Sequence, residues 1–199
     1  MWQRLLFRFR AKRTLHRLSV AVALLSTSKQ RALAFDKLDL ALRLVQKYAT
    51  GKFRELQTDV RSILVADLPT FRGCYHHKHR MIELEMDYVL DAQTTTESLA
   101  STLIHEAQHA RLRRLGFGYD ELIRARIERL CFGAQRIFAR QLPKGEKLIA
   151  EAETWMEADL EAVFSTEARK QAHLKALEDL KCPGWIKKTA AWVYKRRTA

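Results

Sequence analysis

Two kinds of hydrophobic periodicity run along this chain, and together they predict an α+β protein that is predominantly helical. Within residues 80–89, positions 82–88 alternate strictly between apolar and polar side chains, which is the period of a half-buried strand. Short apolar runs at 61–66 and 73–76 predict further strands. We therefore expect a small sheet of two to four strands, with 73–76 paired to the alternating segment.

Most of the remaining chain shows apolar residues at the three- and four-residue spacing of an amphipathic helix. Only seven glycines and three prolines occur in 199 residues, which also favours helices. Helices are predicted over 2–25, 30–49, 94–115, 120–138, 146–164 and 167–180, with a last one after Pro183-Gly184.

The helix over 94–115 has clear start and stop signals. Thr94 is the expected N-cap, and Glu97, three residues later, completes a capping box. Gly116 is the expected C′ residue, and three arginines precede it, where cations suit the helix dipole.

This helix contains the sequence His105-Glu106-Ala107-Gln108-His109, which matches the pattern H-E-x-x-H. Residues four apart share one helical face, so the His105 and His109 imidazoles can reach one metal ion. Glu106 can then lie beside a metal-bound water and act as its general base. The pattern therefore predicts a site for one Zn²⁺ ion.

A catalytic zinc usually has three protein ligands and an open position for water. No histidine follows His109 nearby, so a carboxylate must be the third ligand. Glu128 is the first candidate because it borders the apolar stripe of the helix over 120–138 and can enter a cleft without being stranded in the core. Glu121, two turns earlier on the same face, is the reserve candidate. Cys131 can line the cleft, although a buried structural thiol is the more ordinary role.

Over about residues 80–130, the chain resembles a small gluzincin, a zinc metallopeptidase with H-E-x-x-H on one helix and a glutamate ligand on the next. The resemblance implies a zincin-like core, with a small sheet packed on the helix that carries His105, Glu106 and His109. It also implies hydrolysis of peptide bonds in peptide or protein substrates. Some gluzincins place an aspartate four residues after the glutamate ligand to orient a histidine. Here Phe132 occupies that position, so the orienting partner must come from elsewhere.

Substrate contacts can also be predicted. The alternating strand at 80–89 can pair with an extended substrate main chain by strand addition. His76 and Tyr119 are the candidates for stabilising the oxyanion that forms when the carbonyl is attacked. His77 and His79 are expected in a solvated turn rather than at a second metal site.

We expect one domain spanning 1–199, in which 1–31 form a basic N-terminal helical arm, 53–130 the sheet and metal-site helices, and 131–199 the C-terminal helices with a basic tail. The net charge of +13 is concentrated at the two ends, since 1–31 carry eight basic residues and 181–199 carry six, all without an acid. Clustered cations of this kind can contact an anionic membrane surface or nucleic acid.

An alternative interpretation is therefore an inactive zincin-scaffold protein that binds anionic membrane or nucleic acid through its basic termini. Three widely spaced cysteines, without a C-x-x-C pair, indicate neither a disulfide framework nor a zinc knuckle. The most apolar run, 18–25, is too short to span a bilayer. We expect a cytoplasmic protein, and the alternative is a protein bound peripherally at the membrane.

Overall fold

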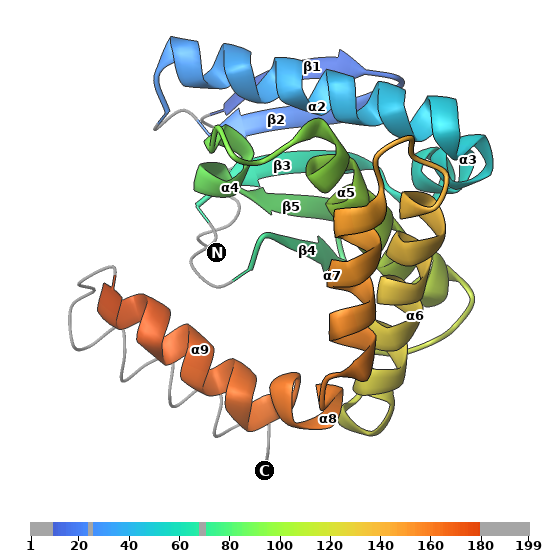
Figure 1. The fold of residues 1–199 in the computed structure, drawn as a ribbon. Helices are drawn as coiled ribbons and strands as arrows, with labels where there is room; N and C mark the ends of the chain where they lie inside the picture. Colours follow the sequence, from blue (N-terminus) through green and yellow to red (C-terminus); the bar gives the residue numbers. More distant parts are fainter. Residues whose placement is uncertain (1–9, 24–25, 68–70, 180–199) are drawn as a thin grey trace.

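A mixed five-stranded sheet with helices against one face forms the centre of the protein (Figure 1). The structure, a computed structural model, describes residues 10–23, 26–67 and 71–179. The strands are β1 (Arg10–Leu15), β2 (Leu18–Ala23), β3 (Ser62–Ala66), β4 (Gly73–His76) and β5 (Met81–Glu85). The helices are α2 (Ser28–Tyr48), α3 (Thr50–Asp59), α4 (Met86–Leu90), α5 (Thr96–Arg114), α6 (Glu121–Ala139), α7 (Glu146–Glu157), α8 (Leu160–Val163) and α9 (Thr166–Asp179). The predicted α+β, mostly helical class is thus confirmed.

The strands follow the order β1-β2-β3-β5-β4. β2, β3 and β5 are parallel, whereas β1 and β4 run antiparallel to their neighbours at the two edges. β5 therefore lies inside the sheet, between β3 and β4. Among the described residues, β4 is the edge strand next to α5.

The N-terminal prediction was wrong for the described part of its range. Residues 10–23 form the β1–β2 hairpin rather than a helix, so the sheet begins well before residue 53. Val20 and Val22 pack into the main core on one face of β2, and Ala21 is buried in a small cluster on the other face. A strand covered on both faces reads as a continuous apolar run, which the helical spacing did not distinguish from a helix. The turn residues His16 and Arg17 both have positive φ (48° and 68°), as a two-residue hairpin turn requires, but neither is a usual turn residue.

Side chains from the neighbouring helices hold this turn. Asp39 of α2 lies 3.0 Å from His16 Nε2, and the Gln57 amide of α3 donates to the His16 carbonyl over 2.7 Å. These contacts offset the cost of left-handed backbone at non-glycine residues.

Two details of the next segments also differ from expectation. The strand predicted over 80–89 ends at Glu85, because the Glu85 carboxylate accepts from the backbone N–H groups of Asp87 and Tyr88 and starts α4. The N-cap of α5 is Thr95 rather than Thr94, and its hydroxyl accepts from the Ser98 N–H over 3.1 Å. The predicted Thr94–Glu97 capping box is therefore one residue out of register.

The main core lies between the sheet and helices α2 and α5. Inward side chains of β2, β3 and β5 meet apolar residues from one stripe of each helix. The residues at the centre of this core are Val20, Val22, Ile63, Val65, Ile82, Leu84, Leu38, Leu42, Leu99 and Leu103. Burial of this face fixes α5 against the sheet and so determines which of its side chains point elsewhere.

The helix predicted over 146–164 is divided into α7 and α8, and α3 was not predicted. Of the basic N-terminal arm predicted over 1–31, residues 1–9 and 24–25 lie outside the described residues, and the remainder contains β1, β2 and the first turn of α2. The predicted basic tail at 181–199, with the segment after Pro183-Gly184, also lies outside the described residues. The membrane and nucleic-acid contacts assigned to the two arms stay predictions. Within the described residues, no helix combines the length and apolar composition needed to cross a membrane.

Candidate metal centre and catalytic carboxylate

Helix α5 positions three of the four predicted site residues. Its C-terminus is a Schellman motif, in which Gly116 at φ 91° donates to the Arg113 carbonyl and Phe117 donates to the Leu112 carbonyl. Gly116 is therefore the C′ residue that the sequence predicted. With both ends of α5 fixed, His105 and His109 face α6, and Glu106 faces the sheet.

Helix α6 supplies the residues opposite. Glu128, Phe132 and Gln135 follow one another at helical spacing on the face of α6 that meets α5. Each contacts His105: the Glu128 carboxylate and the Gln135 amide by hydrogen bonds, and Phe132 by an edge-on ring contact with centroids 4.8 Å apart.

The donor atoms of His105, His109 and Glu128 converge on one point. The two Nε2 atoms lie 3.2 Å apart, and the Glu128 carboxylate oxygens lie 3.2 Å from His105 Nε2 and 3.5 Å from His109 Nε2. Zinc binds nitrogen and oxygen at about 2.0–2.1 Å, so the edges of its coordination tetrahedron measure roughly 3.3–3.4 Å. The Nε2–Nε2 distance and the distance from His105 Nε2 to Glu128 Oε2, both 3.2 Å, are close to this edge length, while the other carboxylate oxygen, Oε1, is the one near His109. The residues present therefore fit a zinc ion.

Cys131 is the other possible third ligand. Its sulfur and the two imidazoles form a group whose donor atoms lie within 4.8 Å of one another. The Glu128 carboxylate oxygens lie 3.2 Å from His105 Nε2 and 3.5 Å from His109 Nε2. Burial raises the pKa of the Cys131 thiol well above its ordinary value, so this thiol is protonated in the metal-free protein. Glu128 is therefore the first candidate for the third ligand, and Cys131 is the alternative.

Charge within the cluster is arranged for a cation. Glu128 is only 2 % exposed, and burial alone would raise its pKa. Hydrogen bonds with the two imidazoles outweigh burial and hold the pKa of this carboxyl far below its ordinary range. Burial lowers the pKa of His105, but the Glu128 and Glu106 carboxylates reverse this effect and raise it. The pocket thus favours positive charge between its two histidines and Glu128.

The orienting partner of His105 is Gln135, a residue that the sequence analysis did not name. Its amide nitrogen lies 3.1 Å from Ser101 Oγ and 3.3 Å from the Ser101 carbonyl, so its oxygen faces His105 Nδ1 at 3.0 Å. Nδ1 therefore carries a hydrogen, so in the neutral imidazole the Nε2 lone pair would face the metal position. Gln135 lies seven residues after Glu128, and this two-turn spacing was the signal available in the sequence.

Glu106 lies between α5 and the edge strand β4. Glu106 is 5 % exposed, and its carboxylate accepts a hydrogen bond from the backbone N–H of Tyr75. Burial raises the pKa of Glu106, against the lowering effect of the nearby histidines. A raised carboxyl pKa suits a general base at neutral pH.

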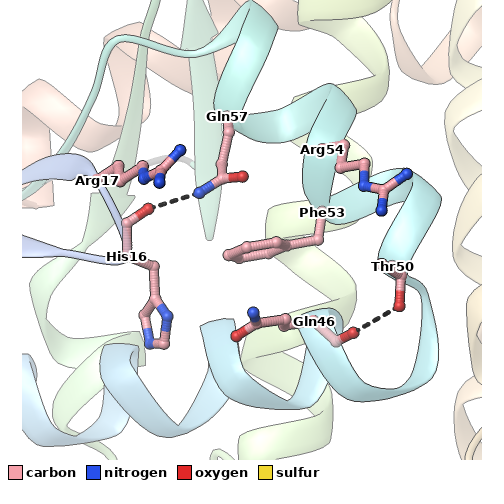
Figure 2. Close-up of a pocket in the computed structure, with 7 residues that line it drawn as sticks. All are labelled: His16, Arg17, Gln46, Thr50, Phe53, Arg54 and Gln57. Atoms are coloured by element: carbon pink, nitrogen blue, oxygen red, sulfur yellow. Dashed lines mark hydrogen bonds between the residues drawn. The ribbon is translucent and has the colours of Figure 1, made fainter.

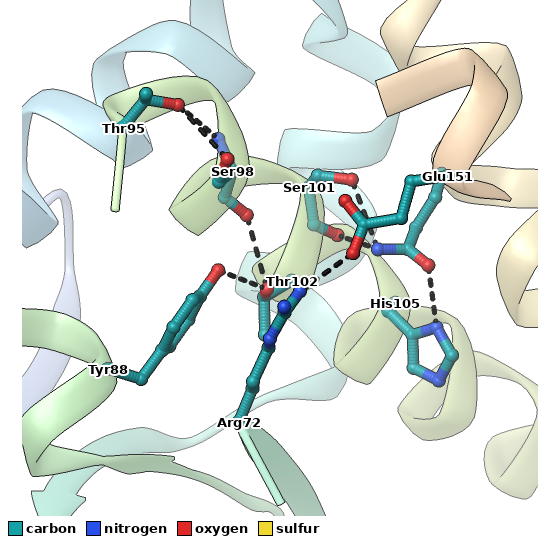
Figure 3. Close-up of polar contacts among 9 residues, drawn as sticks. Arg72, Tyr88, Thr95, Ser98, Ser101, Thr102, His105 and Glu151 are labelled. Carbon is teal, nitrogen blue, oxygen red and sulfur yellow. Dashed lines mark hydrogen bonds and ion pairs between the residues drawn. The ribbon is translucent and has the colours of Figure 1, made fainter. Parts of the chain in front are cut away.

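Gly73 makes this close approach of β4 possible. A Cβ at this position would lie 3.2 Å from Glu106 Oε1 and 3.1 Å from Thr102 Cγ2. Tyr88 also contacts Thr102, with the two hydroxyl oxygens 2.9 Å apart (Figure 3). Arg72, the residue before β4, pairs with Glu151 of α7 over 2.7 Å. These contacts hold β4, α5 and α7 around the same site.

The remaining predicted residues separate into those at the site and those away from it. The Tyr119 hydroxyl donates to Glu128, and its ring meets His109 with centroids 5.5 Å apart. His76 instead lies 2.5 Å from Glu83. Glu121, the reserve ligand, is exposed and binds Arg124 and Thr166, so its prediction as a ligand was wrong.

A separate hollow of about 400 Å³ lies beside the β1–β2 turn and α3 (Figure 2). It is lined by His16, Arg17, Gln46, Thr50, Phe53, Arg54 and Gln57. None of the predicted site residues lines it, so it is not part of the candidate centre.

No family model matches this chain, and neither the curated proteins nor the solved structures contain a match to it.

Proposed function

We propose that this protein is a zinc-dependent peptidase in which His105, His109 and Glu128 hold the metal and Glu106 is the general base. The observation that carries the proposal is the cluster in which the two Nε2 atoms lie 3.2 Å apart and the Glu128 oxygens Oε2 and Oε1 lie 3.2 Å from His105 and 3.5 Å from His109. A buried carboxylate, Glu106, lies on the adjacent residue of the same helix. The gluzincin resemblance of residues 80–130 supports the same assignment.

Zinc at this position would supply a Lewis acid that lowers the pKa of water and polarises a carbonyl. Glu106 accepts a proton from the attacking water and then passes it to the departing amine. Its raised pKa supports both transfers, because the carboxyl can hold the proton between them. Gln135 keeps His105 in the tautomer that leaves Nε2 unprotonated.

Tyr119 is the better candidate than His76 for contact with the oxyanion, because it already lies against His109 and Glu128. Burial raises the pKa of its hydroxyl, so Tyr119 stays a hydrogen-bond donor at physiological pH. His76 is held by Glu83 instead.

The substrate main chain pairs with β4 in this proposal. The sequence analysis predicted that the substrate pairs with the strand at 80–89. This prediction was wrong, because β5 already has a strand on each side. β4 is an edge strand and lies against the helix that carries Glu106, so an extended peptide added to it would pass the candidate centre.

The test is the Glu106→Gln variant. It should retain zinc at one equivalent, as measured by elemental analysis, and lose at least about 10³-fold in the rate of peptide cleavage. Glu97→Gln, on the first turn of α5, is the matched control and should cleave normally. Wild-type protein that purifies without zinc, or Glu106→Gln protein that cleaves at the wild-type rate, would contradict the proposal.

A further inference from the structure

Three aromatic residues from successive helices form an aromatic wall next to the candidate centre: Phe132 of α6, Trp155 of α7 and Phe164 after α8. The Phe132 and Trp155 rings are stacked, with an interplanar angle of 3° and centroids 5.5 Å apart. Phe164 meets Trp155 at 6.4 Å and 55°. The three rings thus form one continuous apolar surface.

This wall begins at the metal-site histidine. Phe132 touches the His105 ring edge-on, so Trp155 lies two ring contacts away from His105. The inner end of the wall is therefore part of the site, and its outer end extends along α7.

Glu151 shows which way Trp155 faces. It precedes Trp155 by one helical turn and shares its face of α7, and its carboxylate pairs with Arg72 at the start of β4. Gly73, the next residue, lies against Glu106. Trp155 therefore lies on the side of α7 that faces the edge strand on which we place the substrate.

Trp155 is the exposed part of the aromatic wall. Phe132 is buried, but Trp155 retains 38 % of its accessible surface. The nearby charges are paired with each other, Arg72 with Glu151 and Arg129 with Glu161. A half-exposed indole of this kind is the feature that binding sites use to hold apolar and aromatic groups.

We propose that the aromatic wall binds an apolar side chain, preferably aromatic, of the residue adjacent to the cleaved peptide bond. The inference rests on the proposed function, because it takes the bound peptide to be a substrate that is cleaved. Binding to the aromatic wall itself needs neither the metal nor the reaction. The substrate class is therefore peptides with Phe, Tyr or Leu at this position, rather than Gly or an acidic residue.

Binding can be measured without turnover. We would titrate the full-length Glu106→Gln protein, with zinc added, with N-acetyl-phenylalanine amide and follow the indole N–H signals by NMR. The Trp155→Phe variant assigns the Trp155 signal. This signal should shift saturably with the phenylalanine amide and at least 10-fold more weakly with N-acetyl-glycine amide. A Trp155 signal that does not distinguish the two amides overturns the inference.

Kinetics supply the second measurement. With matched peptides carrying Phe or Gly beside the cleaved bond, Trp155→Ala should reduce the Phe-to-Gly ratio of kcat/KM by about 10-fold. Ile137→Ala, an exposed apolar residue of α6 outside the wall, is the control and should keep the ratio. An unchanged ratio in Trp155→Ala overturns the inference. A selective Trp155 shift without any hydrolysis would support the wall and contradict the peptidase proposal.

Discussion

Gln135 Oε1 lies 3.0 Å from His105 Nδ1, so an uncharged amide orients this imidazole. Ser101 fixes the orientation of that amide through its hydroxyl and its carbonyl. The helix pair α5–α6 therefore carries both the candidate ligands and the group that orients one of them.

Replacing Gln135 should weaken metal binding without removing a ligand. We expect Gln135→Leu to reduce zinc affinity by about 10- to 100-fold, because His105 loses the hydrogen bond that sets its tautomer and ring orientation. Competition with a chromogenic chelator measures the affinity. Gln141→Leu, past the end of α6 and exposed, is the control and should bind zinc as the wild type does.

The third ligand can be identified by comparing two residues one turn apart. Glu128→Gln should lose stoichiometric zinc, whereas Cys131→Ala should keep it and lower the free energy of unfolding by roughly 1 kcal/mol through lost packing. Elemental analysis and chemical denaturation distinguish the two effects. Zinc lost from Cys131→Ala but kept by Glu128→Gln would move the assignment to the cysteine.

Gly73 should control the position of Glu106. In Gly73→Ala, the new methyl group would meet Glu106 Oε1 at 3.2 Å and push the carboxylate from its place. We expect kcat/KM to fall by about 10- to 100-fold, since small displacements of a catalytic group have effects of this size. Zinc content should not change. Gly133→Ala, where a Cβ would meet nothing within 4 Å, is the control and should stabilise α6 by about 0.5–1 kcal/mol.

Glu106 should make the metal-free protein less stable as pH rises. Its pKa is raised above the usual 4.5 by burial, so the folded protein holds this proton at pH values where the unfolded chain has released it. The stabilising contribution is complete below the unfolded pKa and is lost as pH rises through the folded pKa.

Glutamine does not titrate, so Glu106→Gln should gain stability over the wild type as pH increases from about 4 to 7. The gain is about 1.4 kcal/mol for each unit by which the pKa is raised. Denaturation in the presence of a chelator measures it. A difference between the two proteins that is constant over this pH range would contradict the assignment of the effect to Glu106.

Asp59 at the end of α3 should depend on Arg114 at the end of α5. The Asp59 residue is 2 % exposed, and Arg114 Nε lies 2.5 Å from its Oδ1. Arg114→Gln should cost about 2–4 kcal/mol in the free energy of unfolding, because it leaves a buried carboxylate without this partner. Arg113→Gln, at an exposed neighbouring position, should change stability by less than about 0.5 kcal/mol. Equal effects of the two substitutions would show that the pair is not stabilising.

The sequence carried enough information to predict the helix pair and the convergence of His105, His109 and Glu128, because these relationships are local. Helical spacing alone places the two imidazoles together, and the loop between α5 and α6 brings Glu128 opposite them. Gln135 follows from the same spacing and could have been predicted from its position two turns after Glu128. The assignment of zinc and of hydrolysis stays a prediction.

Other features depend on contacts that the chain pattern does not encode. The β1–β2 turn uses His16 and Arg17 instead of glycine or asparagine, and Asp39 and Gln57, more than twenty residues away, stabilise it. The role of Gly73 depends on packing against Glu106 thirty-three residues later. Neither relationship leaves a periodic signal, so the hairpin was predicted as a helix and the glycine was passed over.

The proximity of the candidate ligands along the chain has a consequence for how the protein folds. Only 23 positions separate His105 from Glu128, whereas the parallel pairing of β2 with β3 joins Ala21 to Leu64. Closing the shorter loop costs less conformational entropy, and local contacts form sooner than distant strand pairs. Under the proposed metal assignment, we therefore expect the α5–α6 hairpin to bind zinc before the sheet is complete, so that metal supply during synthesis would influence the yield of native protein.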